Sequence, residues 1–213
     1  MKEYQAYLFD WDGTLATTLD TWLKIIKQNY QKYGLFPDDA TITADFGDWR
    51  AAEKRGLAPE KVDAFVEDLR KLAHNTIQSA PLYPHAKETI SKLRAAGKKT
   101  ALVTSSTRET IDAVLEHHDL VDLFDVVVTG SEVDNHKPHP ESLEFAMKEL
   151  EVSKTETVMI GDSDKDLLAA QNAGIDSVLF FPESHRTFHN REKLEALNPA
   201  AVIADLLELI TNR

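Results

Sequence analysis

Short and nearly continuous apolar runs recur along the chain, separated by stretches with a different periodicity. Runs of this kind are typical of strands that are covered on both faces, as in a parallel sheet. The first run is aromatic and ends at a glycine-containing turn, which suits a buried strand that leads into an exposed loop. The pattern predicts core strands at residues 4–9, 99–104, 126–129, 157–160 and 177–181.

Amphipathic stretches with helical periodicity alternate with these strands. Gly97 and Gly174 follow two of the stretches directly and are expected to end those helices. Strands that alternate with helices favour an α/β fold with a doubly wound parallel sheet and right-handed crossovers. The helices are expected at residues 85–96, 108–117, 140–150 and 164–173, followed by a short strand and a closing helix within residues 201–210.

Residues 17–81 break the alternation, because they contain no convincing strand and only helical patterning over residues 19–33 and 61–77. The segment is too long for a plain connection in a compact domain, so it is expected to be a helical insertion. An insertion directly after the first strand lies above the carboxyl end of that strand, where open α/β sheets bind their ligands. We therefore predict a catalytic core of residues 1–16 and 82–213, with a helical cap at residues 17–81 that acts as a lid.

The composition narrows the possible partners and ligands. The chain has no cysteine, so a metal must be held by oxygen or imidazole ligands, which suits hard cations such as Mg²⁺. A formal charge of −12 without a local basic cluster makes nucleic acid an unexpected partner. No run approaches the ~18 apolar residues of a membrane helix, and the N-terminus lacks the long apolar segment of a signal peptide. A cytoplasmic protein that does not bind membranes is expected.

Two carboxylates follow the first predicted strand directly, in the sequence Asp10-Trp11-Asp12-Gly13-Thr14. Residues two apart in an extended chain point the same way, so Asp10 and Asp12 can face one pocket. A carboxylate can attack phosphorus to give an acyl phosphate that water then clears. A second carboxylate can protonate the leaving oxygen and later activate that water. Two anions that face a phosphate also require cations to offset their charge.

Further polar residues follow the other predicted strands. Thr104 and Ser105 precede a predicted helix and offer hydroxyls and free amides for phosphate oxygens. Lys137 follows the third strand and supplies a point charge for a phosphoryl group. Asp162 follows the fourth strand, beside Asp10 if the two strands are neighbours, and Asp166 is four residues further on, where the two could share one helical face.

These segments resemble, in order and in spacing, the motifs of the haloacid dehalogenase-like superfamily. They are most similar to its phosphatase branch, in which a helical cap is inserted after the first strand. The resemblance covers essentially the whole chain, and any one motif alone would be a weak signal. The matching segments are DxDGT at residues 10–14, VTSS at residues 103–106, KPHP at residues 137–140 and GDSDKD at residues 161–166.

The resemblance implies catalytic roles by position. Asp10 would be the nucleophile and Asp12 the general acid and base. Lys137 would tie the phosphate to Asp10, and Ser105 or Thr104 would bind the phosphate oxygens. The implied reaction is the hydrolysis of a small phosphorylated metabolite through a phosphoaspartate on Asp10.

The resemblance also implies Mg²⁺ as the cofactor. Its ligands would be Asp10, the backbone carbonyl of Asp12 and Asp162, while Asp166 would be a direct ligand or an outer carboxylate. Enzymes of this superfamily that cleave carbon–halogen bonds lack the second aspartate of the DxD motif, so Asp12 argues against dehalogenation. Phosphoglycolate, pyrophosphate, nucleoside monophosphates and sugar phosphates all remain open as substrates.

Three alternatives to a phosphatase remain. The β-phosphoglucomutases carry a histidine twelve residues after the nucleophile, where this chain has Trp22, so a sugar-phosphate mutase is less favoured. A receiver-type phosphoaspartate signalling module is usually shorter and lacks the insertion. A silent binding protein on the same fold is the third. Within the cap, Trp22 and Trp49 are expected in the cap core, and Arg50 is the candidate substrate contact.

Overall fold

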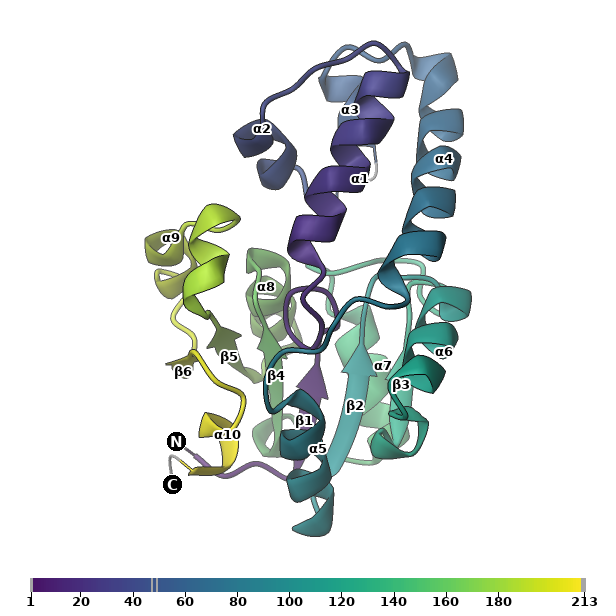
Figure 1. Ribbon diagram of the computed structural model, residues 1–213. Coiled ribbons are helices and arrows are strands. Elements are labelled where there is room, and N and C mark those ends of the chain that lie inside the picture. Colours follow the sequence, from purple (N-terminus) through teal and green to yellow (C-terminus); the bar gives the residue numbers. More distant parts are fainter. Residues whose placement is uncertain (1, 47, 49, 212–213) are drawn as a thin grey trace.

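The structure, a computed structural model, describes residues 2–46, 48 and 50–211. In Figure 1 the strands lie side by side, their arrowheads point toward a group of helices at one end, and the two termini lie close together at the opposite end. The strand order is β3-β2-β1-β4-β5-β6, and every neighbouring pair is parallel. The predicted doubly wound α/β fold is confirmed.

The predicted core strands are present, each within two residues of its expected bounds, and the short strand expected in the tail is the sixth. The sheet centre is β1, which pairs with β2 on one side and β4 on the other. Residues that follow these three strands therefore meet at one edge of the sheet. The strands are β1 (Ala6–Phe9), β2 (Lys99–Val103), β3 (Val126–Val128), β4 (Thr157–Gly161), β5 (Asp176–Phe180) and β6 (Ala201–Ile203).

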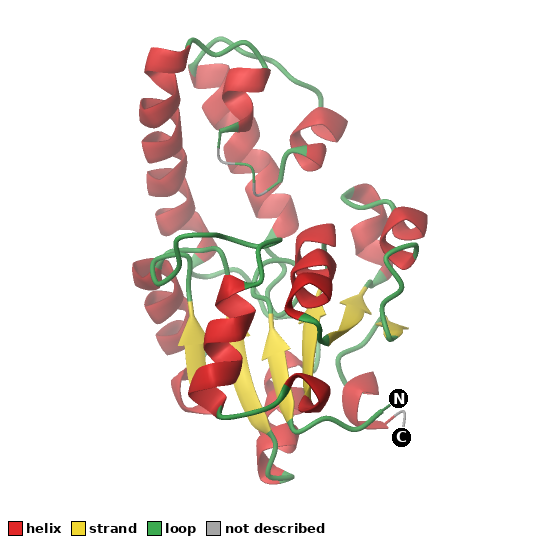
Figure 2. Cartoon of the chain, turned by 180° about the vertical axis from the view of Figure 1, so that it is seen from behind, coloured by secondary structure: helices red, strands yellow, loops and turns green. Residues whose placement is uncertain are grey.

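Helices cover both faces of the sheet, as Figures 1 and 2 show. Side chains alternate along β1, so Tyr7 and Phe9 pack into the apolar layer on one face, while Ala6 and Leu8 pack into the layer on the other. The first layer includes α5 (Ala86–Ala95), α6 (Arg108–His117) and α10 (Glu208–Thr211), and the second includes α7 (Glu141–Leu150) and α8 (Asp164–Ala173).

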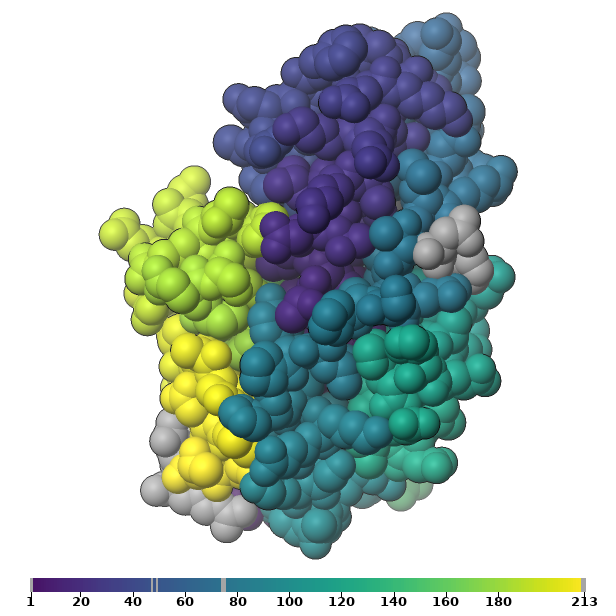
Figure 3. All heavy atoms as spheres, in the orientation of Figure 1, coloured from purple at the N-terminus to yellow at the C-terminus, as the bar shows by residue number. Residues whose placement is uncertain are grey.

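The chain between the first strand and α5 forms the expected helical insertion. Its two long helices match the predicted ones, and two short helices between them were not predicted. The four pack around an apolar core of their own. Figure 1 shows them as a cap above the sheet edge to which the strands point, and Figure 3 shows the same segment, purple to blue, at the upper end of the molecule. They are α1 (Leu19–Lys32), α2 (Asp39–Ala44), α3 (Ala51–Lys54) and α4 (Pro59–Ile77).

The insertion begins and ends at the same place, because Thr17 N–H donates to the Pro81 carbonyl at 2.8 Å and Ala16 is bridged to Leu82. This geometry agrees with a core of residues 1–16 and 82–213, whose boundaries stay a prediction. Within the described ranges, no helix combines the length and hydropathy needed to cross a membrane.

Outside the cap, four further short helical segments of the described chain were not predicted from the periodicity. Two of them, η3 and α9, lie between β5 and β6 and beside the cap in Figure 1. Each spans five residues or fewer, too short to give a helical repeat of apolar positions. They are η1 (Val121–Leu123), η2 (Lys154–Glu156), η3 (Glu183–Thr187) and α9 (Arg191–Glu195).

Candidate active site

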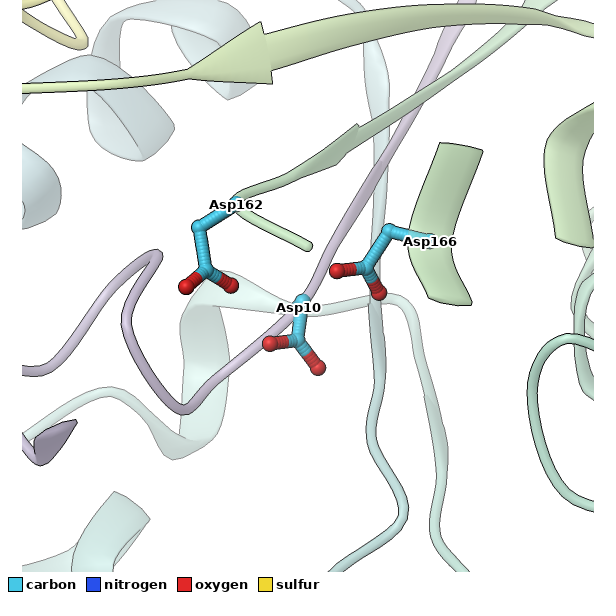
Figure 4. A group of neighbouring side chains, drawn as sticks. All are labelled: Asp10, Asp162 and Asp166. Carbon is cyan, nitrogen blue, oxygen red and sulfur yellow. The ribbon is translucent and has the colours of Figure 1, made fainter. Parts of the chain in front are cut away.

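Three carboxylates meet at the edge of the sheet beneath the cap. Asp10 follows β1, Asp162 follows β4, and Asp166 lies in the first turn of α8. Each offers one oxygen that lies within 4.8 Å of the other two, and their exposed fractions are 7%, 2% and 1%. Figure 4 shows the three side chains grouped at the ends of β1 and β4 and the start of α8. Such closely spaced buried anions need a cation between or beside them.

Lys137 supplies one positive charge to this group. Its Nζ donates to Asp10 Oδ1 at 2.6 Å, to Asp166 Oδ1 at 2.6 Å and to the Val103 carbonyl at 3.0 Å. Burial opposes the charge, but the two carboxylates raise the pKa of Lys137 above its usual value. The ammonium is therefore permanently charged and fixed by three acceptors.

One ammonium does not balance the carboxylates around Asp10. Burial raises the pKa of Asp10 well above its usual value, Lys137 opposes that shift, and the charges of Asp166 and Asp162 add to it. A second cation would keep Asp10 ionised. The available donors are carboxylate oxygens, the ligands that a hard divalent cation such as Mg²⁺ prefers. The donor set therefore fits the predicted magnesium ion.

The carboxylate of Asp12 lies outside this group of three and is held by donors from two other elements. Trp22 Nε1, on cap helix α1, donates to Asp12 Oδ1 at 2.7 Å, and Ser106 Oγ donates to Asp12 Oδ2 at 3.0 Å. Burial raises the pKa of Asp12, while these two donors oppose that shift. Trp22 packs against the cap core as expected, and its contact with Asp12 was not predicted.

Asp162 is held by two polar side chains. Thr14 Oγ1 donates to Asp162 Oδ1 at 3.4 Å, and His189 Nε2 lies 3.0 Å from Asp162 Oδ2. Burial opposes protonation of His189, but the hydrogen bond and charge of Asp162 raise the pKa of the imidazole above its usual value. His189 comes from the segment between η3 and α9 and was not predicted from the sequence.

Both oxygens of Asp166 already accept hydrogen bonds. Oδ1 accepts from Lys137, and Oδ2 accepts from the backbone N–H of Ser163 at 3.2 Å and from its hydroxyl at 2.6 Å. This capping box at the start of α8 fixes the carboxylate. Gly161 makes the arrangement possible, because a Cβ at that position would lie 2.3 Å from Asp166 Cβ.

We expect Gly161→Ala to damage both stability and catalysis. The added methyl group must displace Asp166, which would move Lys137 away from Asp10. Overpacking of this kind costs about 1–3 kcal/mol of unfolding free energy, and a displacement of ~1 Å at a catalytic group can lower turnover about a hundredfold. Urea unfolding and phosphate release measure the two effects.

Gly34→Ala is the control without a steric clash, because a Cβ at Gly34 would have no neighbour within 4 Å. Its φ of 75° makes alanine strained, so a loss of about 1 kcal/mol is expected there with normal turnover. Full stability and full turnover in Gly161→Ala would show that Asp166 need not be held in place.

The two predicted hydroxyl residues differ in their contacts: the Thr104 hydroxyl accepts a hydrogen bond within its own loop, whereas Ser105 is part of the cavity wall. Thr104 is buried, and its Oγ1 accepts from the backbone N–H of Ser106 at 3.1 Å. Ser105 is half-buried and lies against the same cavity as Asp10. Thr107 caps α6 through a bond from Thr110 N–H. Ser105 is therefore the better placed of the two for a phosphate oxygen.

A cavity of about 660 Å³ lies between these residues and the cap. The structure does not bring Arg50 to it: this exposed residue pairs with Asp63 at 3.0 Å and is absent from the cavity wall. Its contact with substrate stays a prediction, and Trp49 lies outside the described residues. The predicted residues that line the cavity are Asp10, Asp12, Thr104, Ser105, Lys137, Asp162 and Asp166.

Comparisons with known proteins agree on one family. The sequence model described as "Haloacid dehalogenase-like hydrolase" matches residues 7–180. The pyrophosphatase PpaX of Halalkalibacterium halodurans is 35% identical over 182 residues, which cover 83% of each chain.

Solved structures show the same fold. A protein from Bacteroides fragilis described as a haloacid dehalogenase-like hydrolase has a TM-score of 0.86 and 25% identity, covering 98% of this chain and 100% of that one. A predicted phosphoglycolate phosphatase from Haemophilus somnus has a TM-score of 0.79 and 20% identity, covering 100% of this chain and 99% of the other.

Proposed function

The chain belongs to the haloacid dehalogenase-like hydrolase family, and on that basis we propose that it is a magnesium-dependent phosphatase whose nucleophile is Asp10. The observation that carries this proposal is the buried arrangement in which Lys137 bridges Asp10 and Asp166 beside Asp162. One relative is named as a pyrophosphatase, an enzyme that acts on a phosphoryl substrate.

In this proposal the carboxylates of Asp10 and Asp162 and the backbone carbonyl of Asp12 would hold Mg²⁺. The ion supplies charge neutralisation at the phosphoryl group when it is bound. Asp166 acts through Lys137, because its Oδ1 accepts from the ammonium at 2.6 Å and its Oδ2 accepts twice from Ser163. Asp162 Oδ1, in contrast, accepts only the 3.4 Å bond from Thr14. The role of Asp166 is to hold the ammonium against Asp10.

Asp10 attacks the phosphorus atom, and the ester oxygen leaves. Lys137 and the Ser105 hydroxyl bind the phosphoryl oxygens and orient the group for attack. Asp12 gives its proton to the leaving oxygen, and burial favours the protonated form by raising the pKa of Asp12. Trp22 and Ser106 then stabilise the carboxylate that remains, which takes a proton from the water that clears the phosphoaspartate.

Phosphate release from a panel of phosphorylated metabolites, with Mg²⁺ and with excess chelator, tests this function. The account predicts release with Mg²⁺ and none with chelator. The panel contains pyrophosphate, phosphoglycolate, a nucleoside monophosphate and a sugar phosphate. An isomer of a sugar phosphate in place of free phosphate would favour a mutase, and a lasting phosphoprotein would favour a signalling module.

Mg²⁺ is also expected to stabilise the folded protein. A ligand that binds only the native state at a hundred times its dissociation constant adds about 2.7 kcal/mol to the free energy of unfolding. Thermal melts with Mg²⁺ and with chelator measure this gain without any substrate. Asp162→Asn should lose most of it, because one ligand is gone.

Asp112→Asn is the control for the loss of a negative charge, since Asp112 is exposed on α6, outside the cavity wall. It should keep the full gain. An equal gain in Asp162→Asn and in wild type would place the ion elsewhere.

A further inference from the structure

The cap side of the cavity is lined mainly by apolar side chains. They come from all four cap helices and the loop after α2, and they continue the wall upward from the carboxylates. Several of these side chains are buried, so the cavity extends into the space between the cap helices. Trp22, Ile26, Ile42, Phe46, Phe65 and Leu69 form much of this wall.

The charged groups on that wall are acidic. Within the described part of the cap, no lysine or arginine lines the cavity, whereas Asp45 and Asp48 do. The nearby cap cations are already engaged: Arg55 pairs with Asp45 at 2.8 Å, and Lys54 pairs with Asp48 at 2.6 Å. The cations that the described cap brings nearest on α4, Arg70 and Lys71, line an adjoining cavity and not this one.

The cations that line the cavity come from the core. Lys137 is held by its two carboxylates, and Lys193 lies on α9. Lys165 donates to the backbone carbonyl of Phe46 in the cap, and burial lowers the pKa of this lysine. Positive charge thus reaches the cavity beside Asp10 and, through Lys165, at Phe46 in the loop after α2, while the part of the wall formed by Trp22, Ile26, Phe65 and Leu69 is apolar.

This polarity decides which leaving group the cavity suits. Pyrophosphate would place a second phosphate against the cap wall, and phosphoglycolate would place a carboxylate there. An anion that loses water without gaining a cation is strongly disfavoured. A carbon skeleton without charge gains from the same wall through the burial of apolar surface. A cavity of about 660 Å³ also lies within the usual size range for organic ligands.

We propose that the substrate is a phosphate monoester whose leaving group is uncharged and largely apolar, and not pyrophosphate or phosphoglycolate. The proposal rests on the phosphatase function above and concerns the group that the cap contacts. The phosphoryl end lies at Asp10 and Lys137, and the apolar end lies between α1, α2 and α4.

The series methyl, propyl and hexyl phosphate tests this directly, because the three esters have the same scissile phosphate ester bond and differ only in the length of the alkyl chain. Each buried methylene should raise kcat/KM about fourfold. Pyrophosphate and phosphoglycolate, measured beside them, should fall below hexyl phosphate. The proposal would be overturned if kcat/KM were the same for all three esters, or if it were higher for pyrophosphate or phosphoglycolate than for hexyl phosphate.

A charge placed on the wall gives the second test. Ile26 on α1 is half-buried and lines the cavity, so Ile26→Lys should lower kcat/KM for hexyl phosphate at least about tenfold and raise it for pyrophosphate. Gln28→Lys adds the same charge to an exposed position of α1 outside the cavity wall and should change neither.

A variant that fails to fold is recognised by circular dichroism, and Ile26→Ala then replaces it. Removing apolar contact at this position should reduce the increase in kcat/KM from methyl to hexyl phosphate. An unchanged increase would count against the proposal.

The outcomes separate this inference from the function it rests on. Magnesium-dependent release that needs Asp10 and is fastest with pyrophosphate or phosphoglycolate would leave the phosphatase intact and overturn the apolar leaving group. Release from none of the compounds, with the protein folded and Mg²⁺ present, would overturn both.

Discussion

Asp10→Asn is expected to lower phosphate release at least about 10⁴-fold, as happens when a covalent nucleophile is removed. The amide has nearly the same shape as the carboxylate, so its oxygen can still accept from Lys137 at the position of Oδ1. It cannot form an acyl phosphate that water clears. The fold should therefore survive while turnover is lost.

Single-turnover phosphate release and thermal melts separate these two effects. Asp112→Asn on the exposed face of α6 again serves as the control for charge, and it should match wild type in both measurements. If Asp10→Asn kept turnover within tenfold of wild type, another group would have to be the nucleophile.

Lys137→Met should combine a loss of turnover with a loss of stability. Removing one partner of a buried ionic group leaves uncompensated charge, which costs about 3–5 kcal/mol of unfolding free energy. Here the stranded carboxylates are Asp10 and Asp166. The lost contact with the phosphoryl group should also lower turnover about 10²–10³-fold, as when one transition-state donor is removed.

The instability of Lys137→Met should depend on pH in a defined direction. Burial already raises the pKa of Asp10 in the folded protein, and removal of the ammonium raises it further. The folded state then binds more protons than the unfolded chain, so stability falls as the pH rises through this range. The deficit relative to wild type should be larger near about pH 8 than near about pH 5.

Urea unfolding in the presence of chelator measures this deficit without interference from Mg²⁺. Lys148→Met removes an exposed lysine from α7 and should show neither the deficit nor its pH dependence. A deficit that stayed constant with pH would mean that the stranded carboxylates are not its cause.

The positions of Asp10, Asp162 and Ser105 could be predicted from the sequence, because the geometry of a parallel sheet brings the carboxyl ends of neighbouring strands together. Asp10 and Asp162 follow β1 and β4, which are neighbours, so their side chains meet once the strands pair. Ser105 follows β2 on the other side of β1. Lys137 lies in the loop between β3 and α7, so strand order alone does not place it at the site. It was predicted from its resemblance to the lysine motif of the family.

Contacts made across the fold were not predictable in the same way. Trp22 contacts Asp12 because α1 begins at the end of the sheet where the site lies. The apolar pattern of α1 predicted only that Trp22 packs within the cap. His189 comes from a segment of short turns without a periodic pattern. Arg50 precedes the short helix α3 as its N-cap residue, where no periodic pattern indicates which way a side chain points.

The proposed mechanism passes through a covalent phosphoryl group on Asp10, which mass spectrometry after an acid quench can detect. The protein is mixed with Mg²⁺ and the ester that it turns over fastest, stopped within one turnover, and digested. We expect one added phosphoryl group on the peptide that contains Asp10, and none in Asp10→Asn. Steady turnover with no phosphopeptide, or with phosphate on a different residue, would contradict it.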